Sequence, residues 1–287
     1  MSEVAAAHVT PPDVGRSIGF LGGGHMGRAL VAALRGAGVA GSRIIVFDTQ
    51  AATRDALQGD FGIRVADDAS AHIASIDLLV LAVKPQDMAA ALRPLKPALA
   101  RHRPLVISVA AGLGTQQLAE LCGDQVPLVR AMPNRPALLG AGATGAYADP
   151  TLEPAYRRRA ETVLGAAGCV VWVEDEALMD VVTAVSGSGP AYFFRMAEAL
   201  AAAGIAQGLP AAAANELAVA TLHGAGLMAS RGANLTALRE SVTSKGGTTA
   251  AALAQFTAQG FEQGVADAVA AAVTRGRQMA AQYGTGS

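Results

Sequence analysis

The first part of the chain alternates short apolar runs with segments of helical spacing. The apolar runs are mostly continuous, as is typical of parallel strands buried on both faces. They predict strands at Ser17–Leu21, Arg43–Phe47, Asp77–Val83, Pro104–Val109, Val126–Met132, Ala143–Tyr147 and Cys169–Val173. Between them we predict helices at Met26–Arg35, Ala51–Gln58, Asp87–Leu92, Thr115–Leu121 and Glu153–Leu164. Such alternation favours a doubly wound α/β sheet.

Beyond Glu174 the strand patterns stop and alanine-rich helical segments follow. Pro190 and Pro210 stand near helix starts, where proline is well tolerated. Small side chains let helices pack closely, which suits helices interleaved between subunits better than a lone bundle. We predict helices at Ala177–Val185, Pro190–Ala203, Pro210–Ala229, Thr248–Phe256 and Phe261–Ala281.

The composition supports an oligomer. Hydrophobic residues make up 52% of the chain and charged residues 16%, which indicates more exposed apolar surface than a solitary domain tolerates. We therefore expect a frayed tail over residues 1–16, a sheet domain over 17–174, and an all-helical dimerisation and substrate domain over 175–287.

Charge and targeting signals exclude several classes. A net charge of −1 gives no general case for binding nucleic acid or a membrane. The chain start lacks the pattern of a signal peptide, and no apolar stretch has membrane-spanning length. Cys122 and Cys169 form no disulfide framework, so we expect a reducing cytoplasm and two buried cysteines that act as small apolar residues.

Three glycines carry the strongest motif, in the segment SIGFLGGGHMGRAL at residues 17–30. Gly22, Gly24 and Gly27 have the order G-x-G-x-x-G: the first permits a tight turn, the second lets backbone approach a pyrophosphate, and the third lets a helix pack on a strand. The pyrophosphate would bind free N–H groups at the helix start. A strand pattern before the motif and a helix pattern after it predict dinucleotide binding.

Asp48 ends the second predicted strand, about two dozen residues after the glycine turn. An acidic residue there normally accepts hydrogen bonds from the adenosine ribose 2′-OH and repels a 2′-phosphate, which favours NAD(H). Arg54 is close enough in sequence to offer a competing phosphate contact. The choice between NADH and NADPH therefore stays open, with NAD(H) favoured.

No histidine has the setting of a general base for alcohol oxidation. His8 lies in the tail, His72 and His102 lie in surface-like segments, and His223 lies within an alanine-rich helix. His25 stands inside the glycine turn, where it is placed to flank a cofactor. The chain has no metal-ligand spacing, nucleophile elbow or Walker lysine. The chemistry therefore needs a positioned hydride and little else, which suits a protonated imine.

Further segments identify the family. They are LVLAVKPQ (Leu79–Gln86), ISVAAGL (Ile107–Leu113), RAMPNRPALLGAGATG (Arg130–Gly145), AVSGSGPAYFF (Ala184–Phe194) and VTSKGGTTAAAL (Val242–Leu253). Together with IGFLGGGHMG, they resemble pyrroline-5-carboxylate reductases along nearly the whole chain beyond the tail. The resemblance implies a Rossmann domain and reduction of the cyclic imine 1-pyrroline-5-carboxylate to L-proline, the last step of proline biosynthesis. The hydride would pass from nicotinamide C4 of NADPH or NADH to the imine carbon.

The cofactor side of the site would lie at strand ends. Lys84 is placed to contact a ribose or phosphate, and the small Ala110–Gly112 side chains leave room for nicotinamide. Asn134 can orient the carboxamide or the substrate, or it is an ordinary turn residue. The resemblance implies cofactor contacts at Gly22, Gly24, His25, Met26, Gly27, Asp48, Ala82, Val83, Lys84, Pro85, Ala110, Ala111, Gly112 and Asn134.

The substrate side would be the Thr243–Thr249 loop, whose successive N–H groups and hydroxyls precede a helix and form a nest for a carboxylate. By the resemblance, Thr249 hydrogen-bonds the ring nitrogen and is the catalytic candidate that places or relays the proton. Ser186–Pro190 would line the other side of the pocket or serve packing alone. The implied substrate contacts are Ser186, Ser244, Gly246, Gly247, Thr248 and Thr249.

Two positions depart from the family pattern. Arg135 replaces a small residue, usually threonine, and Lys245 stands where the family usually has proline. Either cation could strengthen carboxylate binding or reach a cofactor phosphate from a neighbouring subunit. Without the fixed φ of proline, the loop at Lys245 should be looser. These changes bear on substrate and cofactor preference more than on the reaction class.

The resemblance also implies a homodimer with swapped helices, often assembled further into a decamer, and a site shared between subunits. One alternative is a reductase of a related cyclic imino acid, since a pocket discriminates one methylene by only about 1–3 kcal/mol. A β-hydroxyacid dehydrogenase would need Lys and Asn where this chain has Phe193 and Ala197. A non-catalytic dinucleotide-binding protein is the third alternative, and it would not need the second pocket.

Overall fold

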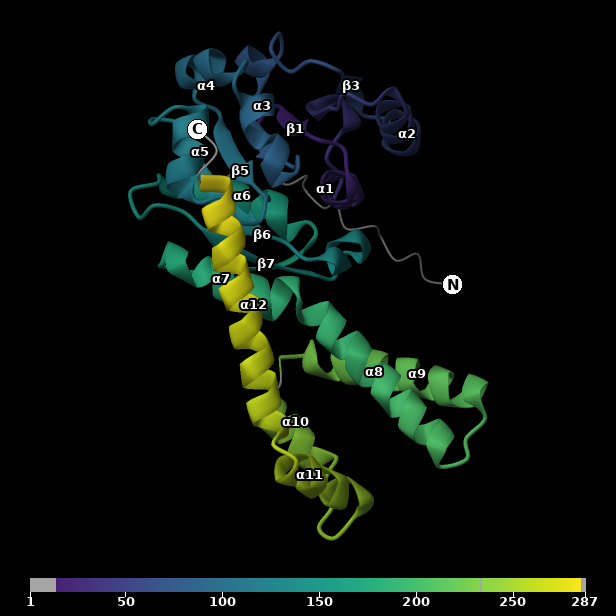
Figure 1. Cartoon of the computed structure of the whole chain (residues 1–287). Coiled ribbons are helices and arrows are strands. Elements are labelled where there is room, and N and C mark those ends of the chain that lie inside the picture. The colour runs from purple at the N-terminus through teal and green to yellow at the C-terminus, as the bar shows by residue number, and fades with distance from the viewer. Residues whose placement is uncertain (1–13, 233, 285–287) are drawn as a thin grey trace. The chain divides into compact units, whose positions relative to one another are not determined.

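The computed structural model describes residues 14–232 and 234–284, which form two compact units (Figure 1). Unit 1 is the chain up to Gly187 together with the residues from Val273 onward, and unit 2 is Ser188–Ala272. Residues 1–13 of the expected tail lie outside the described residues. The domain boundary expected at 174/175 stays a prediction. Among the described residues, no helix is long and apolar enough to cross a membrane.

Unit 1 is built on an eight-stranded sheet in the order β3-β2-β1-β4-β5-β6-β7-β8. Strands β1 to β6 are parallel to one another, whereas β7 runs antiparallel to β6 and β8 runs parallel to β7. The strands are β1 Ile18–Leu21, β2 Ile44–Phe47, β3 Arg64–Ala66, β4 Leu78–Leu81, β5 Leu105–Ser108, β6 Leu128–Met132, β7 Gly142–Tyr147 and β8 Gly168–Trp172.

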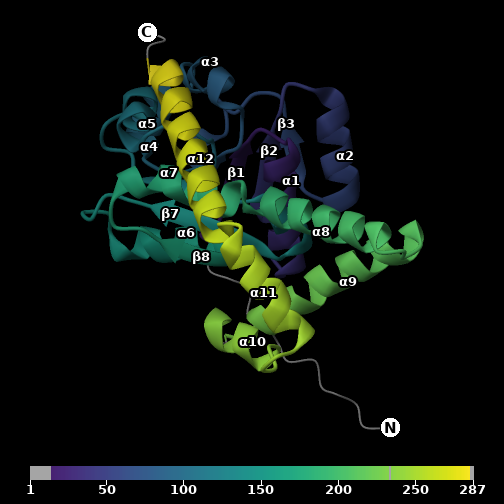
Figure 2. The same ribbon diagram turned by 60° about the horizontal axis from the view of Figure 1, so that its bottom comes forward.

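Helices of unit 1 cover both faces of this sheet, as Figure 1 and Figure 2 show. They are α1 His25–Gly36, α2 Ala51–Phe61, α3 Met88–Leu92, α4 Lys96–His102, α5 Thr115–Cys122, α6 Pro154–Gly165 and α7 Met179–Val182. The helices that begin in unit 2 are α8 Gly189–Ala206, α9 Ala211–Ala229, α10 Leu235–Ser241, α11 Thr248–Ala258 and α12 Phe261–Gly284.

The strands of the sheet divide their side chains between two buried cores. Ile18 and Phe20 pack in a core with residues of α1 and α6, while Ile45 and Phe47 pack in a core with residues of α3, α4 and α5. The side chains on both faces of these strands are therefore buried, which explains why their sequences are continuous apolar runs. The predicted doubly wound sheet with a helical C-terminal region is confirmed.

The structure adds elements that the sequence pattern did not predict. These are β3, α4 and α10, which are all short: β3 has three residues and the two helices have seven each. The antiparallel direction of β7 was also not foreseen, because an apolar run does not record its direction. The helix predicted at Ala177–Val185 is wrong in part, since α7 ends at Val182 and a π-helical turn follows over Thr183–Gly187.

The two cysteines differ in their surroundings. Cys122 is buried in the core beside α4, and burial raises the pKa of its thiol to about 12, so that the thiol stays protonated. Cys169 is exposed, which corrects the expectation that both are buried. It lies on β8 at the edge of the sheet, where alternate residues face solvent, Val171 among them at 59% exposure.

Unit 2 has little core of its own. Its buried cluster consists of Ala201, Ala214 and Ala218, where α8 packs on α9. Large apolar side chains on the same helices are exposed, including Phe193 at 62% and Val219 at 64%. Many exposed large apolar side chains on one pair of helices are typical of an interaction surface, and they agree with the oligomer that the composition indicated.

A buried ion pair ties the end of the sheet domain to the segment that follows it. Arg130 of β6 contacts Glu176 at 3.0 Å, and their side chains are 10% and 26% exposed. Glu176 also accepts hydrogen bonds from the backbone N–H and hydroxyl of Thr115, at the start of α5. Asp180 lies 3.9 Å from both Arg130 and Arg277. One carboxylate thus joins β6, α5 and the approach to α7.

We expect Arg130→Met to lower the free energy of unfolding by about 3 kcal/mol, because it leaves Glu176 half-buried without its cation. Urea denaturation at fixed protein concentration measures this change. Arg16→Met is the matched control, since Arg16 pairs with Asp77 but is 94% exposed and its loss should cost less than about 1 kcal/mol. Equal losses in both variants would contradict the role given to the buried pair.

Candidate functional site

The ends of the parallel strands bring the expected cofactor residues to one edge of the sheet. β1 lies between β2 and β4, and β4 is followed in the sheet by β5 and β6. The glycine turn follows β1, Asp48 follows β2, and Ala82–Pro85 follow β4. Ala110–Gly112 follow β5, and Asn134 follows β6. In open α/β sheets, ligands bind at this edge, where the strand order reverses beside β1.

The glycine turn has no room for side chains at two of its three positions. Gly22 has φ +101°, and a Cβ there would lie 2.8 Å from the carbonyl carbon of Ala82. A Cβ on Gly27 would lie 2.4 Å from the carbonyl oxygen of Gly22. Gly24 differs: nothing lies within 4 Å of its Cβ position. The turn is therefore closed toward the protein and open at Gly24, as a cradle for a pyrophosphate requires.

The start of α1 can bind an anion at this opening. Gly24 is the N-cap residue and has no side chain to satisfy the first N–H groups of the helix. The helix start carries partial positive charge, which favours phosphate oxygens. His25 is exposed in the first turn and Met26 is half-buried beside it. The cofactor contacts expected of His25 and Met26 stay predictions.

Asp48 is bound to the glycine turn itself. Its Oδ2 accepts a hydrogen bond from the N–H of Gly23 at 2.9 Å, and its Oδ1 accepts one from the N–H of Gln50 at 2.9 Å. Arg54 donates from Nη1 to the Asp48 carbonyl at 2.7 Å. The carboxylate thus holds the turn, and each oxygen keeps a further lone pair for a ribose hydroxyl. The cation Arg54 and the anion Asp48 therefore lie side by side, at the position where a 2′-phosphate would be distinguished from a 2′-hydroxyl.

Gly23 is a residue of the turn that the sequence reasoning missed. Besides its bond to Asp48, it faces α2: a Cβ would lie 2.6 Å from Leu57 and 2.9 Å from Thr53. The sequence did carry a signal for Gly23: residues 22–24 are all glycine, although the G-x-G part of the motif requires glycine only at 22 and 24.

The ends of β4 and β5 supply small or exposed residues. Ala82, Val83 and Pro85 are half-buried, and the Lys84 side chain is exposed. Ala110 is buried, and Gly112 has φ +80°, a backbone conformation that favours glycine. The cofactor contacts expected at these residues stay predictions.

Asn134 and Ser186 are engaged with the protein rather than with open space. Asn134 donates from Nδ2 to the Ser186 carbonyl and accepts from the Ala143 N–H, both at 2.9 Å. The Ser186 hydroxyl donates to the carbonyl of Val182 at 2.9 Å. Their expected roles as direct cofactor and substrate contacts stay predictions, and the structure places both side chains in internal hydrogen bonds.

The Thr243–Thr249 loop lies in unit 2 and forms the N-terminus of α11. Gly246 has φ +73°, and Gly247 is the N-cap residue without a side-chain partner for the helix N–H groups. The Thr243 hydroxyl donates to the Arg239 carbonyl. Ser244, Lys245 and Thr248 are exposed and Thr249 is half-buried. The free N–H groups and hydroxyls of this loop can hold a carboxylate.

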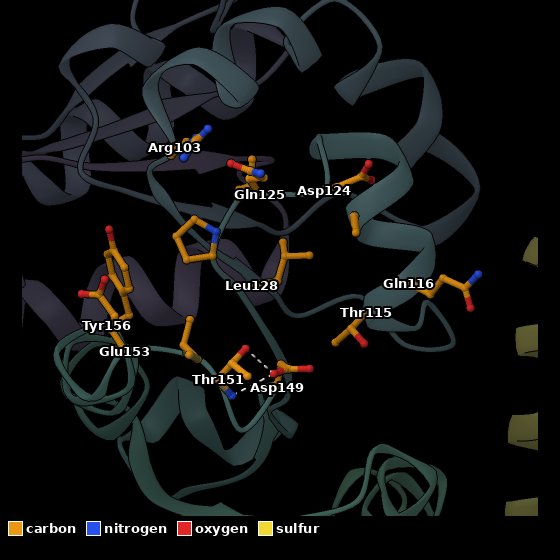
Figure 3. A pocket seen from close by; sticks show the side chains of 14 residues that line it. Arg103, Thr115, Gln116, Asp124, Gln125, Leu128, Asp149, Thr151, Glu153 and Tyr156 are labelled. Atoms are coloured by element: carbon orange, nitrogen blue, oxygen red, sulfur yellow. Dashed lines mark hydrogen bonds between the residues drawn. The ribbon is translucent and has the colours of Figure 1, made fainter.

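A separate cleft of about 590 Å³ lies at the opposite edge of the sheet (Figure 3). Leu128, where β6 begins, lines it, together with Thr115 and Asp149. Asp149 accepts hydrogen bonds from the hydroxyl and N–H of Thr151, which hold the pKa of its carboxyl below the ordinary value. None of the residues expected to bind cofactor or substrate lines this cleft.

Family comparisons cover both parts of the chain. Residues 17–112 match the family described as NADP oxidoreductase, coenzyme F420-dependent, and residues 176–279 match the family described as pyrroline-5-carboxylate reductase dimerisation. The chain is 42% identical to the pyrroline-5-carboxylate reductase of Pseudomonas aeruginosa, over 93% of this chain and 98% of the relative. It is 41% identical to that of Haemophilus influenzae, over 91% of this chain and 97% of the relative.

Solved structures agree with these matches. A pyrroline-5-carboxylate reductase from Coxiella burnetii superposes with a TM-score of 0.89 at 35% identity, over 92% of this chain and 99% of that one. The pyrroline carboxylate reductase of Plasmodium falciparum with NADP bound superposes with a TM-score of 0.77 at 26% identity, over 92% of this chain and 98% of that one.

We expect Gly24→Ala to weaken dinucleotide binding by at least tenfold, about 1.4 kcal/mol, without changing the melting temperature. The added methyl group enters the open cradle and touches no protein atom. Fluorescence titration with the reduced dinucleotide measures the affinity. Gly36→Ala is the control, because Gly36 is also unobstructed but lies at the far end of α1. An unchanged affinity in Gly24→Ala would place the pyrophosphate elsewhere.

We expect Asp48→Asn to raise the ratio of kcat/KM for NADPH to that for NADH by about tenfold. The amide keeps an oxygen that can accept from Gly23 but removes the charge that repels a 2′-phosphate. Arg54→Gln should shift the ratio in the opposite direction. Steady-state kinetics with both cofactors measure the ratios. If Asp48→Asn leaves its ratio unchanged, the carboxylate serves the glycine turn alone.

Proposed function

Because the chain belongs to the pyrroline-5-carboxylate reductase family, we propose that it reduces 1-pyrroline-5-carboxylate to L-proline. The observation that carries the proposal is the likeness along more than nine-tenths of the chain, with identities of 42% and 41% to curated relatives that are matched over 98% and 97% of their own length. It is an oxidoreductase with NADPH or NADH as hydride donor.

The cofactor fits the residues of the strand edge. The open side of Gly24 and the free N–H groups of α1 would hold the pyrophosphate, and Asp48 with Arg54 would meet the adenosine ribose. Ala110, Ala111 and Gly112 would border the nicotinamide. When bound, the reduced nicotinamide supplies a hydride from C4 to the imine carbon.

The chain's own residues would bind and orient the imine. The N–H groups at the start of α11, with the hydroxyls of Ser244 and Thr248, would hold the substrate carboxylate. The Thr249 hydroxyl oxygen would accept a hydrogen bond from the N–H of the protonated ring nitrogen and so place the proton there. One hydride and one proton are added across the C=N bond, so no alkoxide forms and no strong general acid is required. Proximity and electrostatic holding would then supply the rate.

A β-hydroxyacid dehydrogenase activity does not suit this chain. The lysine that serves as acid–base in that group would stand at Phe193, whose side chain is 62% exposed on α8. An apolar ring cannot protonate or deprotonate an alcohol. The proposal therefore keeps the imine substrate, with six-membered cyclic imino acids as the nearest competitor.

The protein is a homo-oligomer with a small-molecule substrate. We propose that its unit is a homodimer, which covers the exposed apolar helices of unit 2, and that dimers assemble further, as a decamer. We further propose that the substrate loop acts with the dinucleotide-binding part of a partner subunit. Both cysteines are free, which suits a reducing cytoplasm.

The first test is oxidation of NADH and NADPH by the purified oligomer with 1-pyrroline-5-carboxylate, followed by the nicotinamide absorbance and by mass detection of L-proline. We expect turnover with at least one cofactor. Folded protein that binds cofactor but forms no proline would overturn the proposal, and turnover of six-membered imines alone would redirect it. Light scattering on the same sample reports the oligomer size.

Thr249→Val should lower kcat by about 10²-fold, because the isosteric side chain cannot form the hydrogen bond with the ring nitrogen. Thr249→Ser is the matched control, since it keeps the hydroxyl and should retain most of the activity. Comparable losses in both variants would assign Thr249 a packing role.

A further inference from the structure

Asn134 is a buried amide at which three segments of unit 1 meet. Its residue is 8% exposed, and it follows β6 at the edge where the cofactor residues gather. Its Nδ2 donates to the carbonyl of Ser186, and its Oδ1 accepts from the N–H of Ala143 in β7. The amide therefore joins the loop after β6, the beginning of β7 and the π-helical turn that leads into the segment Ser186–Pro190.

The contacts around Ser186 show that this turn is held against β6. The Ser186 hydroxyl donates to the Val182 carbonyl, while its own carbonyl receives Asn134. A Cβ on Gly187 would lie 2.8 Å from the Cε of Met132, the last residue of β6, so the turn packs closely against that side chain. A π-helical turn departs from the regular α-helical hydrogen-bond pattern, and such turns are frequent at functional sites.

We propose that Asn134 is a positioning residue: it sets the place of the Ser186–Gly187 turn relative to the cofactor edge. One donor and one acceptor of its amide are already used at good hydrogen-bond distance, and burial makes both bonds costly to break. The consequence rests on the proposed function and is catalytic: Ser186–Pro190 would border the substrate, and a displacement of about 1 Å can cost 10²-fold in rate.

Asn134→Asp tests this role with a single changed atom. The carboxylate still accepts from Ala143 but cannot donate to the Ser186 carbonyl. In single-turnover experiments, hydride transfer should slow by about 10²-fold, while the Kd for NADPH measured by fluorescence stays close to that of the unmodified chain. The slowed rate should recover in part as the pH falls, because a protonated carboxyl donates an O–H to the same carbonyl.

Gly187→Ala is a second variant that does not touch Asn134. Its methyl group would meet only the Cε of Met132, the end of a flexible side chain that can move aside, so it should slow hydride transfer far less than Asn134→Asp. Asn215→Asp is the matched control: Asn215 also donates to a backbone carbonyl at 2.9 Å, but on α9. It should leave hydride transfer unchanged, with light scattering confirming the same oligomer size.

Hydrogen exchange of the peptide covering residues 183–190 gives a readout that does not need turnover. In Asn134→Asp this peptide should exchange faster, while the peptides of β1 and β2 stay protected. Unchanged exchange together with an unchanged hydride-transfer rate would overturn the proposal, as would a loss of NADPH affinity equal to the loss of rate. If the unmodified chain reduces no 1-pyrroline-5-carboxylate, the proposed function fails, and the exchange alone decides whether Asn134 holds the turn.

Discussion

The close approach of backbone to backbone at the glycine turn is the constraint on which the cofactor side of this protein depends. Gly27 sits so near the Gly22 carbonyl that any side chain would push α1 off β1. Because this close approach is possible, α1 begins directly after β1, and its first N–H groups lie at the end of the strand without a side-chain cap. Asp48 then locks the turn through Gly23, and the ends of β4, β5 and β6 complete the same edge.

The two units solve different physical problems. Unit 1 buries the strands β1, β2, β4 and β5 on both faces against its own helices. Unit 2 has small buried alanines and exposed phenylalanine, leucine and valine, so its helices gain most of their burial from another copy. The loop proposed to hold the substrate carboxylate begins α11 in this unit. The small side chains that suit close helix packing also leave unit 2 with only a small core.

Residue types with only one physical use were predictable. The strand cores at Ile18–Leu21 and Ile44–Phe47 are apolar throughout because both faces are buried, and Gly22 has a positive φ because the turn requires it. Residues with several uses were not. The Asn134 amide could serve a ligand or the protein, and Cys169 is apolar enough for a core yet lies on the exposed side of an edge strand.

The sequence by itself determined the class of fold, the nucleotide-binding turn and the family, because these depend on local periodicity, on glycine conformation and on segments in a fixed order. Only the tertiary structure decided the direction of β7, the π-helical turn at Thr183–Gly187 and the partners of Asn134, Arg130 and Asp48. Those features depend on which segments, distant in the chain, meet at a strand end. An amide or a carboxylate can form hydrogen bonds with many different partners, so only the folded arrangement determines which partner it has.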